Sequence, residues 1–150
     1  MKANAKKETI YANIIMLAVF FFAFLGTEYL FDNCMMYVTD ASGVVRAQNQ
    51  MLGVSAIGFL LYNWISGFLA DKSPWVTGGT GLLAFGVGAG CMGCIILHAG
   101  YVQMMIAGGV LFFLLGVLGA GVHYRMAYSV YDRAMLARCV GFAYAGGIFL

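Results

Sequence analysis

One long stretch without charge decides what this chain can fold into. The residues from Val76 to Val122 contain no lysine, arginine, aspartate or glutamate, and His98 is their only imidazole. That is well beyond the roughly 20 apolar residues that a helix needs to cross a membrane. The chain of 150 residues is 63% hydrophobic and 9% charged, against about 25% charged residues in an ordinary soluble domain. The sequence therefore predicts an all-α, multi-pass membrane protein with no soluble domain.

The length of a membrane-crossing helix divides the chain into four full spans and part of a fifth. The expected spans lie near residues 11–37, 44–70, 76–97 and 101–124, with a partial one at 139–150. Short connections make sequential helices antiparallel neighbours, and a longer polar link, 125–138, precedes the last segment. As a helix that segment covers about 18 Å of a core of roughly 30 Å. It is either a short interfacial helix or, as we favour, the start of a fifth span of a longer protein.

The basic residues predict the orientation of the spans. If the amino terminus is cytoplasmic, seven of the eight lysines and arginines fall on the cytoplasmic side and only Arg46 falls outside. Basic residues accumulate in cytoplasmic loops of membrane proteins. We expect a protein of the plasma membrane with a cytoplasmic amino terminus, in contact with the lipid bilayer. The charge gives no reason to expect a nucleic-acid partner.

Two carboxylates in the first span are the strongest local signal. Glu28 and Asp32 are four residues apart, so they share one face of a helix. A charge inside hydrocarbon costs several kcal/mol unless it meets a cavity or a partner. Glu28 is the deeper of the two, and it is either a proton-coupling or substrate-contacting group or a structural hydrogen-bond partner. Asp32 lies near the outer boundary and is the weaker candidate, because it can be solvated or paired with Arg46.

Uncharged polar groups complete the candidates for a site. Asn63 in the second span can contact a substrate or bridge two helices, and Gln48, Asn49 and Gln50 lie at the outer end of that span. Cys91 and Cys94 have the spacing of a metal or redox pair, but they lie in a glycine-rich apolar run without a second pair, which favours packing. We expect no metal, no cofactor and no enzymatic activity, since no catalytic motif is present.

Glycine is dense in the third and fourth spans. Gly86 and Gly90 form a small-xxx-small pair, which allows helix backbones to approach closely where lipid removes the usual hydrophobic driving force. Such faces indicate tight helix packing, or surfaces along which helices rock during transport.

The connection between the second and third spans carries a family resemblance. A glycine, an aspartate four residues later and then a basic residue stand there as Gly67, Asp71 and Lys72. This resembles the loop motif of the major facilitator superfamily, although Pro74 and Trp75 replace the glycine and the basic residue that usually follow. The resemblance implies two six-helix halves, with the substrate bound between them. This chain resembles the amino-terminal portion of such a protein.

The leading hypothesis is a secondary active transporter that moves a small solute, not identified by the sequence, by alternating access together with the remaining helices of a longer protein. The resemblance also implies that Asp71 latches one conformation, with Arg125 or Arg133 as the possible charge partner. The alternative is a non-transporting membrane module: a sensor, an assembly factor or a small stand-alone helical protein.

Overall fold

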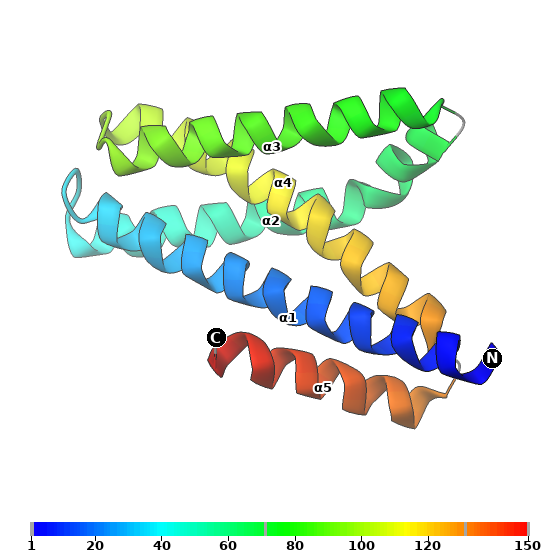
Figure 1. Cartoon of the computed structure of the whole chain (residues 1–150). Coiled ribbons are helices and arrows are strands. Elements are labelled where there is room, and N and C mark those ends of the chain that lie inside the picture. The colour runs from blue at the N-terminus through cyan, green and yellow to red at the C-terminus, as the bar shows by residue number, and fades with distance from the viewer. Residues whose placement is uncertain (1, 71, 131, 150) are drawn as a thin grey trace. The chain divides into compact units, whose positions relative to one another are not determined.

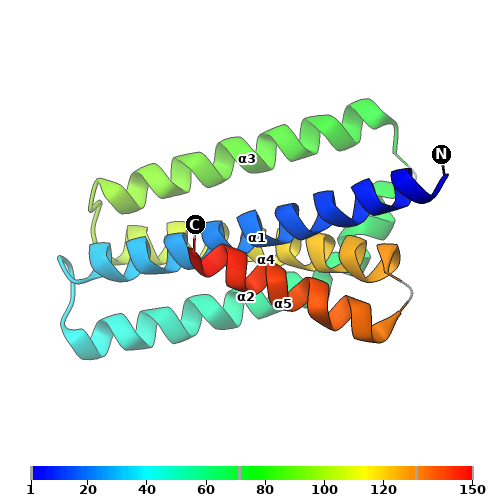
Figure 2. The same ribbon diagram turned by 60° about the horizontal axis from the view of Figure 1, so that its bottom comes forward.

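The fold is entirely helical in the part of the chain that the computed structural model describes, residues 2–70, 72–130 and 132–149, with the side chains of 2–8, 70 and 74–77 left aside. Figures 1 and 2 show the five helices. They are α1 (Lys2–Met35), α2 (Ala41–Ala70), α3 (Pro74–Ile96), α4 (Tyr101–Ser129) and α5 (Arg133–Phe149). Helices α1 to α4 are each long and apolar enough to cross a membrane.

The expected order of helices is confirmed, but the last connection is much shorter than predicted. Helix α4 continues to Ser129 and α5 already begins at Arg133, so most of the segment 125–138, which we expected to be a polar link, is helical. The reason is local. Asp132 caps α5 by accepting a hydrogen bond from the Ala134 backbone N–H (3.0 Å), and the sequence Ala-Met-Leu-Ala-Arg that follows Arg133 consists of strong helix formers.

Each remaining connection is short because a specific residue ends or starts a helix. Pro74 opens α3, where its missing N–H costs no hydrogen bond. After α3, His98 has φ 50° and Gly100 has φ 115°. These left-handed conformations turn the chain sharply, and glycine adopts them without steric penalty.

Asp40 starts α2. Its Oδ1 accepts the Gly43 backbone N–H at 3.0 Å and its Oδ2 accepts the Ser42 hydroxyl at 2.8 Å. The hydrogen bond from Ser42, followed by that from Gly43, lowers the pKa of the Asp40 carboxyl below its ordinary value of 3.8. This is the expected behaviour of a carboxylate at a helix amino terminus.

The chain forms two compact units, each with its own core. Unit 1 consists of the chain up to Thr27 together with the chain from Gly119 onward, and unit 2 is Glu28–Leu118. In unit 2, Phe31 of α1 and Phe112 of α4 are fully buried and pack edge to face, with ring centroids 5.7 Å apart. Gly108 leaves room for them, since a Cβ added there would lie 2.6 Å from the Phe31 ring and 3.0 Å from the Met51 sulfur.

The backbones of α2 and α4 come into direct contact within unit 2. A Cβ on Gly116 would collide with the Ser55 carbonyl oxygen and lie 3.1 Å from the Phe59 nitrogen. A Cβ on Gly58 would collide in the same way with the Phe113 carbonyl. One glycine from each helix therefore makes the contact possible. Dispersion over such a close interface holds membrane helices together, because lipid is as apolar as the helix faces.

Unit 1 is built on aromatic rings and on small residues of α5. Phe21 of α1 packs on Tyr144 of α5, with ring centroids 3.6 Å apart, and edge to face on His123 of α4 at 5.6 Å. Cys139, Ala143 and Gly147 form the buried stripe of α5. A Cβ on Gly147 would lie 2.7 Å from the Phe21 Cβ, so α5 packs closely along α1, as both views show.

Helices α2 and α3 expose most of their apolar side chains. Trp64 on α2 is 81% exposed and Phe85 on α3 is 76% exposed. Gly86 and Gly90 have open space where a Cβ would be, so the pair singled out in the sequence is not a contact within unit 2, whereas Gly58 and Gly116 are. Surfaces of this kind are suited to lipid or to other membrane helices.

The α2–α4 contact predicts an asymmetric response to alanine. We expect Gly116→Ala to lower the free energy of unfolding by about 1–3 kcal/mol, the usual cost of overpacking. The matched control is Gly109→Ala on the same helix, where a Cβ meets nothing within 4 Å; it should be neutral or slightly stabilising. Unfolding in mixed micelles, followed by circular dichroism, measures both. Equal losses for the two variants would contradict the close contact.

The cap of α2 predicts a pH dependence. Because the pKa of Asp40 is lowered in the folded protein, its stabilisation of the first turn is complete above the ordinary pKa and is lost as the pH falls through the lower, folded-state pKa. Ser42→Ala removes the largest cause and should raise the pKa of Asp40 toward its ordinary value. Titration of the Asp40 carboxyl carbon by NMR measures this. An unchanged pKa in Ser42→Ala would exclude the hydroxyl as the cause.

Candidate functional site

The deep carboxylate of the first span meets an amide of the second. Gln48 Nε2 on α2 donates a hydrogen bond of 2.8 Å to Glu28 Oε1 on α1, and both side chains are partly buried within unit 2. The partnership follows from the hairpin. Glu28 lies seven residues before the end of α1 at Met35, and Gln48 lies seven residues after the start of α2 at Ala41. Residues at equal distance from a short turn lie at equal height in antiparallel helices, here about 10 Å from the helix ends.

Asp32 lies one turn beyond Glu28 on the same face and is less well satisfied. It is partly buried, and its Oδ1 is shielded from solvent without a hydrogen-bond partner among the described residues. Pairing with Arg46, one of the two alternatives that the sequence left open, is not seen among the described residues, and Arg46 is exposed. A buried carboxylate oxygen without a donor is costly unless a proton or a cation occupies it.

Asn63 does not belong to this site. It is exposed on α2, fifteen residues beyond Gln48, which is roughly 22 Å along the helix. Its backbone carbonyl accepts a hydrogen bond from the Ser66 hydroxyl (3.1 Å). Of the uncharged polar residues that the sequence offers in the second span, Gln48 is the one that donates to Glu28. The signal that identifies Gln48 is its distance from the turn, which equals that of Glu28.

The loop motif lies at the connection between α2 and α3, as the sequence indicates. Gly67 is exposed near the end of α2 with open space around its Cα. The Lys72 ammonium lies 5.0 Å from the centre of the Phe68 ring, and its backbone N–H donates to the Leu69 carbonyl (3.1 Å). Asp71 lies outside the described residues, so its predicted latch stays a prediction. Arg125 and Arg133 are exposed on α4 and α5.

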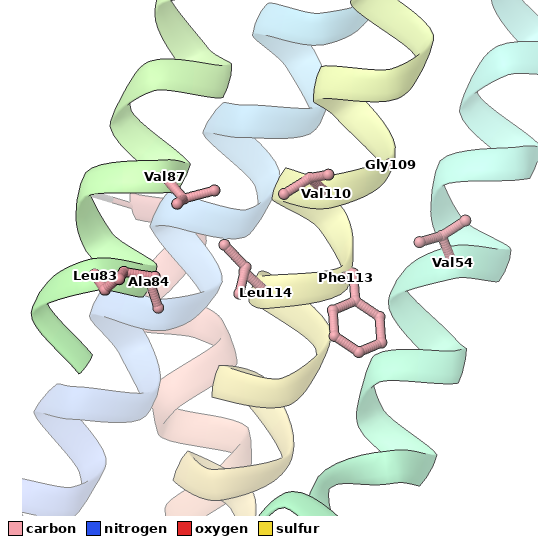
Figure 3. Close-up of a pocket in the computed structure, with 8 residues that line it drawn as sticks. All are labelled: Val54, Leu83, Ala84, Val87, Gly109, Val110, Phe113 and Leu114. Carbon is pink, nitrogen blue, oxygen red and sulfur yellow. The ribbon is translucent and has the colours of Figure 1, made fainter. Parts of the chain in front are cut away.

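Two cavities of unit 2 are apolar and lie beside α3. One, of about 400 Å³, lies among Val54 of α2, Leu83 and Val87 of α3, and Val110 and Phe113 of α4 (Figure 3). A second, of about 610 Å³, lies between α3 and α4 and has no charged residue in its wall. These cavities can hold acyl chains or apolar groups, but neither includes the carboxylates of α1.

The histidines and cysteines form no ligand cluster in the part of the chain described. No group of three or more His, Cys, Asp or Glu side chains there is arranged to hold a metal ion. His123 donates through Nδ1–H to the Gly119 carbonyl oxygen (2.7 Å) and packs on phenylalanine rings. The four cysteines are free thiols, and two of them, Cys34 and Cys139, are buried in the cores.

These features define the class of protein. Four long apolar helices and exposed apolar faces are those of a multi-pass helical membrane protein. No protein-family model matches the sequence, and no curated protein or solved structure is significantly similar to it.

Proposed function

We propose that this chain contributes to a secondary active transporter of a small solute, with Glu28 as the proton-coupling or substrate-contacting carboxyl. The observation that carries the proposal is the Glu28–Gln48 hydrogen bond of 2.8 Å in a membrane-spanning hairpin. An intramembrane carboxylate is expensive, and where it is retained it usually serves an ion or substrate pathway. Gln48 donates one hydrogen bond and leaves the other carboxylate oxygen of Glu28 for a proton or a cationic group.

Asp32 extends the site along α1. Its shielded, unpartnered Oδ1 lies one helical turn from Glu28, so two acidic groups line one face of the same helix. Two neighbouring carboxylates share protons or bind a cation more readily than they hold two negative charges in an apolar setting. This supports a cation-binding or proton-binding centre more than a purely structural hydrogen bond.

The finer proposal is a major facilitator-like arrangement in the plasma membrane, with the amino terminus and the α2–α3 connection in the cytoplasm. It is supported by the motif residues Gly67 and Lys72 at that connection and by the short connections between the helices. The location of Arg125, Arg133 and Arg138 near the α4–α5 connection supports the same orientation.

A second candidate function is a non-transporting assembly module. The observation that favours it is the exposure of apolar side chains on α2 and α3, together with the open space beside Gly86 and Gly90 on α3. Helices with such faces pack against other membrane helices. Transport assays on the full-length protein separate the two functions.

Glu28→Gln tests the transport proposal. The variant keeps the shape of the side chain and its capacity to accept from Gln48, but it cannot titrate. In proteoliposomes with an imposed pH gradient, screened with a panel of small cationic and neutral solutes, we expect it to lose accumulation to the level of protein-free vesicles while retaining exchange. Gln48→Leu should weaken accumulation less, because it leaves the carboxyl in place.

The control is Asp40→Asn, which removes an exposed loop carboxylate and should transport like the unaltered protein. Normal pH-driven accumulation by Glu28→Gln would exclude the coupling role. If the unaltered full-length protein accumulates no solute of the panel, the assembly module is favoured instead.

Cysteine labelling tests the orientation. Ser42→Cys lies at the start of α2, and Ser73→Cys lies just past the end of α2, directly before α3. The two positions therefore lie near opposite ends of α2. In intact cells, a membrane-impermeant maleimide should reach position 42 and should reach position 73 only after the membrane is opened. The reverse pattern would overturn the proposed orientation without touching the fold.

A further inference from the structure

A small groove between α1 and α5 differs from the cavities described above because a positively charged side chain, Arg138, lies at its edge. It measures about 270 Å³ and lies within unit 1. Its apolar wall includes Ile10 and Ile14 of α1 and Met135 and Phe142 of α5, and the Arg138 side chain also lines it. Met135, Arg138 and Phe142 follow each other at helical spacing, so they lie on one face of α5.

The groove lies where a lipid headgroup meets its acyl chain. In the sequence, the charged residues Lys6, Lys7 and Glu8 come directly before the apolar run that includes Ile10, so the groove is at the end of the span. Tyr11, which also lines it, is an amphipathic residue of the kind found at the membrane interface. The two helices pack closely further along, at Gly147, which closes the groove on the side of the membrane interior.

Positively charged side chains outnumber negatively charged ones among the described residues of unit 1, to which the groove belongs. Arg125, Arg133 and Arg138 are all exposed, and Asp132 is the only acidic group among the described side chains of unit 1. The Asp132 carboxylate already caps α5 through the Ala134 N–H. In the described part of the chain, Arg138 has no carboxylate partner. A guanidinium at an apolar groove binds phosphate oxygens well, because its planar donors match them in pairs.

We propose that this groove binds an anionic phospholipid, with the phosphate at Arg138 and the upper part of an acyl chain between α1 and α5. Basic grooves between membrane helices at the interface bind anionic headgroups. The larger cavity between α3 and α4 has no charged residue in its wall, so it offers no group that would distinguish one lipid headgroup from another. We therefore expect headgroup selectivity at the α1–α5 groove. The inference does not depend on the transport proposal.

Native mass spectrometry of the delipidated full chain tests the lipid preference. The protein is titrated with phosphatidylglycerol or with phosphatidylcholine of the same acyl chains. We expect tighter binding of phosphatidylglycerol, and a loss of that preference by roughly fivefold in Arg138→Gln, the factor for about 1 kcal/mol per basic residue at an anionic surface. Arg138→Lys should keep part of the preference, because it keeps the charge but loses the paired donors.

Arg133→Gln is the matched control, since Arg133 is exposed on the same helix but does not line the groove. An equal loss in Arg133→Gln would show diffuse attraction and overturn the site, as would an unchanged preference in Arg138→Gln. Millimolar inorganic phosphate should not displace the lipid. Displacement by phosphate would show a free-anion site instead, and the lipid proposal would fail.

A second measurement needs no variant. Phosphatidylglycerol with a photoreactive group near the top of an acyl chain should label peptides that contain residues 10–14 or 135–142 of the unaltered protein. Labelling confined to α2 and α3 would overturn the proposal even if Arg138→Gln fails to fold.

Discussion

In the hydrocarbon of a membrane, every backbone N–H and C=O must find its partner within the protein, and this requirement shapes each part of the structure. It makes the apolar segments helical from end to end, and it confines the irregular backbone to connections of three to five residues. It also explains why those connections are well capped. Asp40 accepts the Gly43 N–H and Asp132 accepts the Ala134 N–H, so the first turns of α2 and α5 satisfy donors that lipid cannot satisfy.

Once the helices exist, the hydrophobic effect no longer selects which of them pack together. Close backbone contact takes over that role, and the glycines that matter are those that face another helix. Gly58 and Gly116 bring α2 against α4 in unit 2, and Gly147 brings α5 against α1 in unit 1. Gly86 and Gly90 of α3 are also glycines on an apolar helix, but among the described residues nothing lies within 4 Å of a Cβ added at either position. Composition alone therefore does not distinguish an internal contact from an open face.

Two carboxyl groups of this chain, Glu28 and Asp32, lie within a membrane-spanning helix, where a charge is most expensive. Glu28 receives one hydrogen bond from Gln48, while the shielded Oδ1 of Asp32 has no donor among the described residues. A site that is only partly satisfied gains more from a proton or a cation than a fully satisfied network does. In unit 1 the imbalance has the opposite sign: Arg138 lines an apolar groove and has no carboxylate partner among the described residues. The two imbalances suit different ligands: a proton or cation at the carboxylates, and a phosphate at the guanidinium.

The sequence by itself determined that the chain is helical and membrane-spanning, because length and apolarity alone set the cost of exposing these segments to water. It also identified Glu28 and Asp32, since a carboxylate is conspicuous in an apolar run. It did not determine the extent of the last helices: the charges of 125–138 suggested a link, but helix propensity and the Asp132 cap made most of it helical.

Only the tertiary structure decided that Gln48 is the partner of Glu28, while Asn63 lies far along α2. It also decided that Gly58 and Gly116 form the helix contact instead of Gly86 and Gly90, and that Arg138 borders a groove. The physical reason is that these outcomes depend on which helix faces meet, and a uniformly apolar sequence carries little periodic signal to indicate those faces.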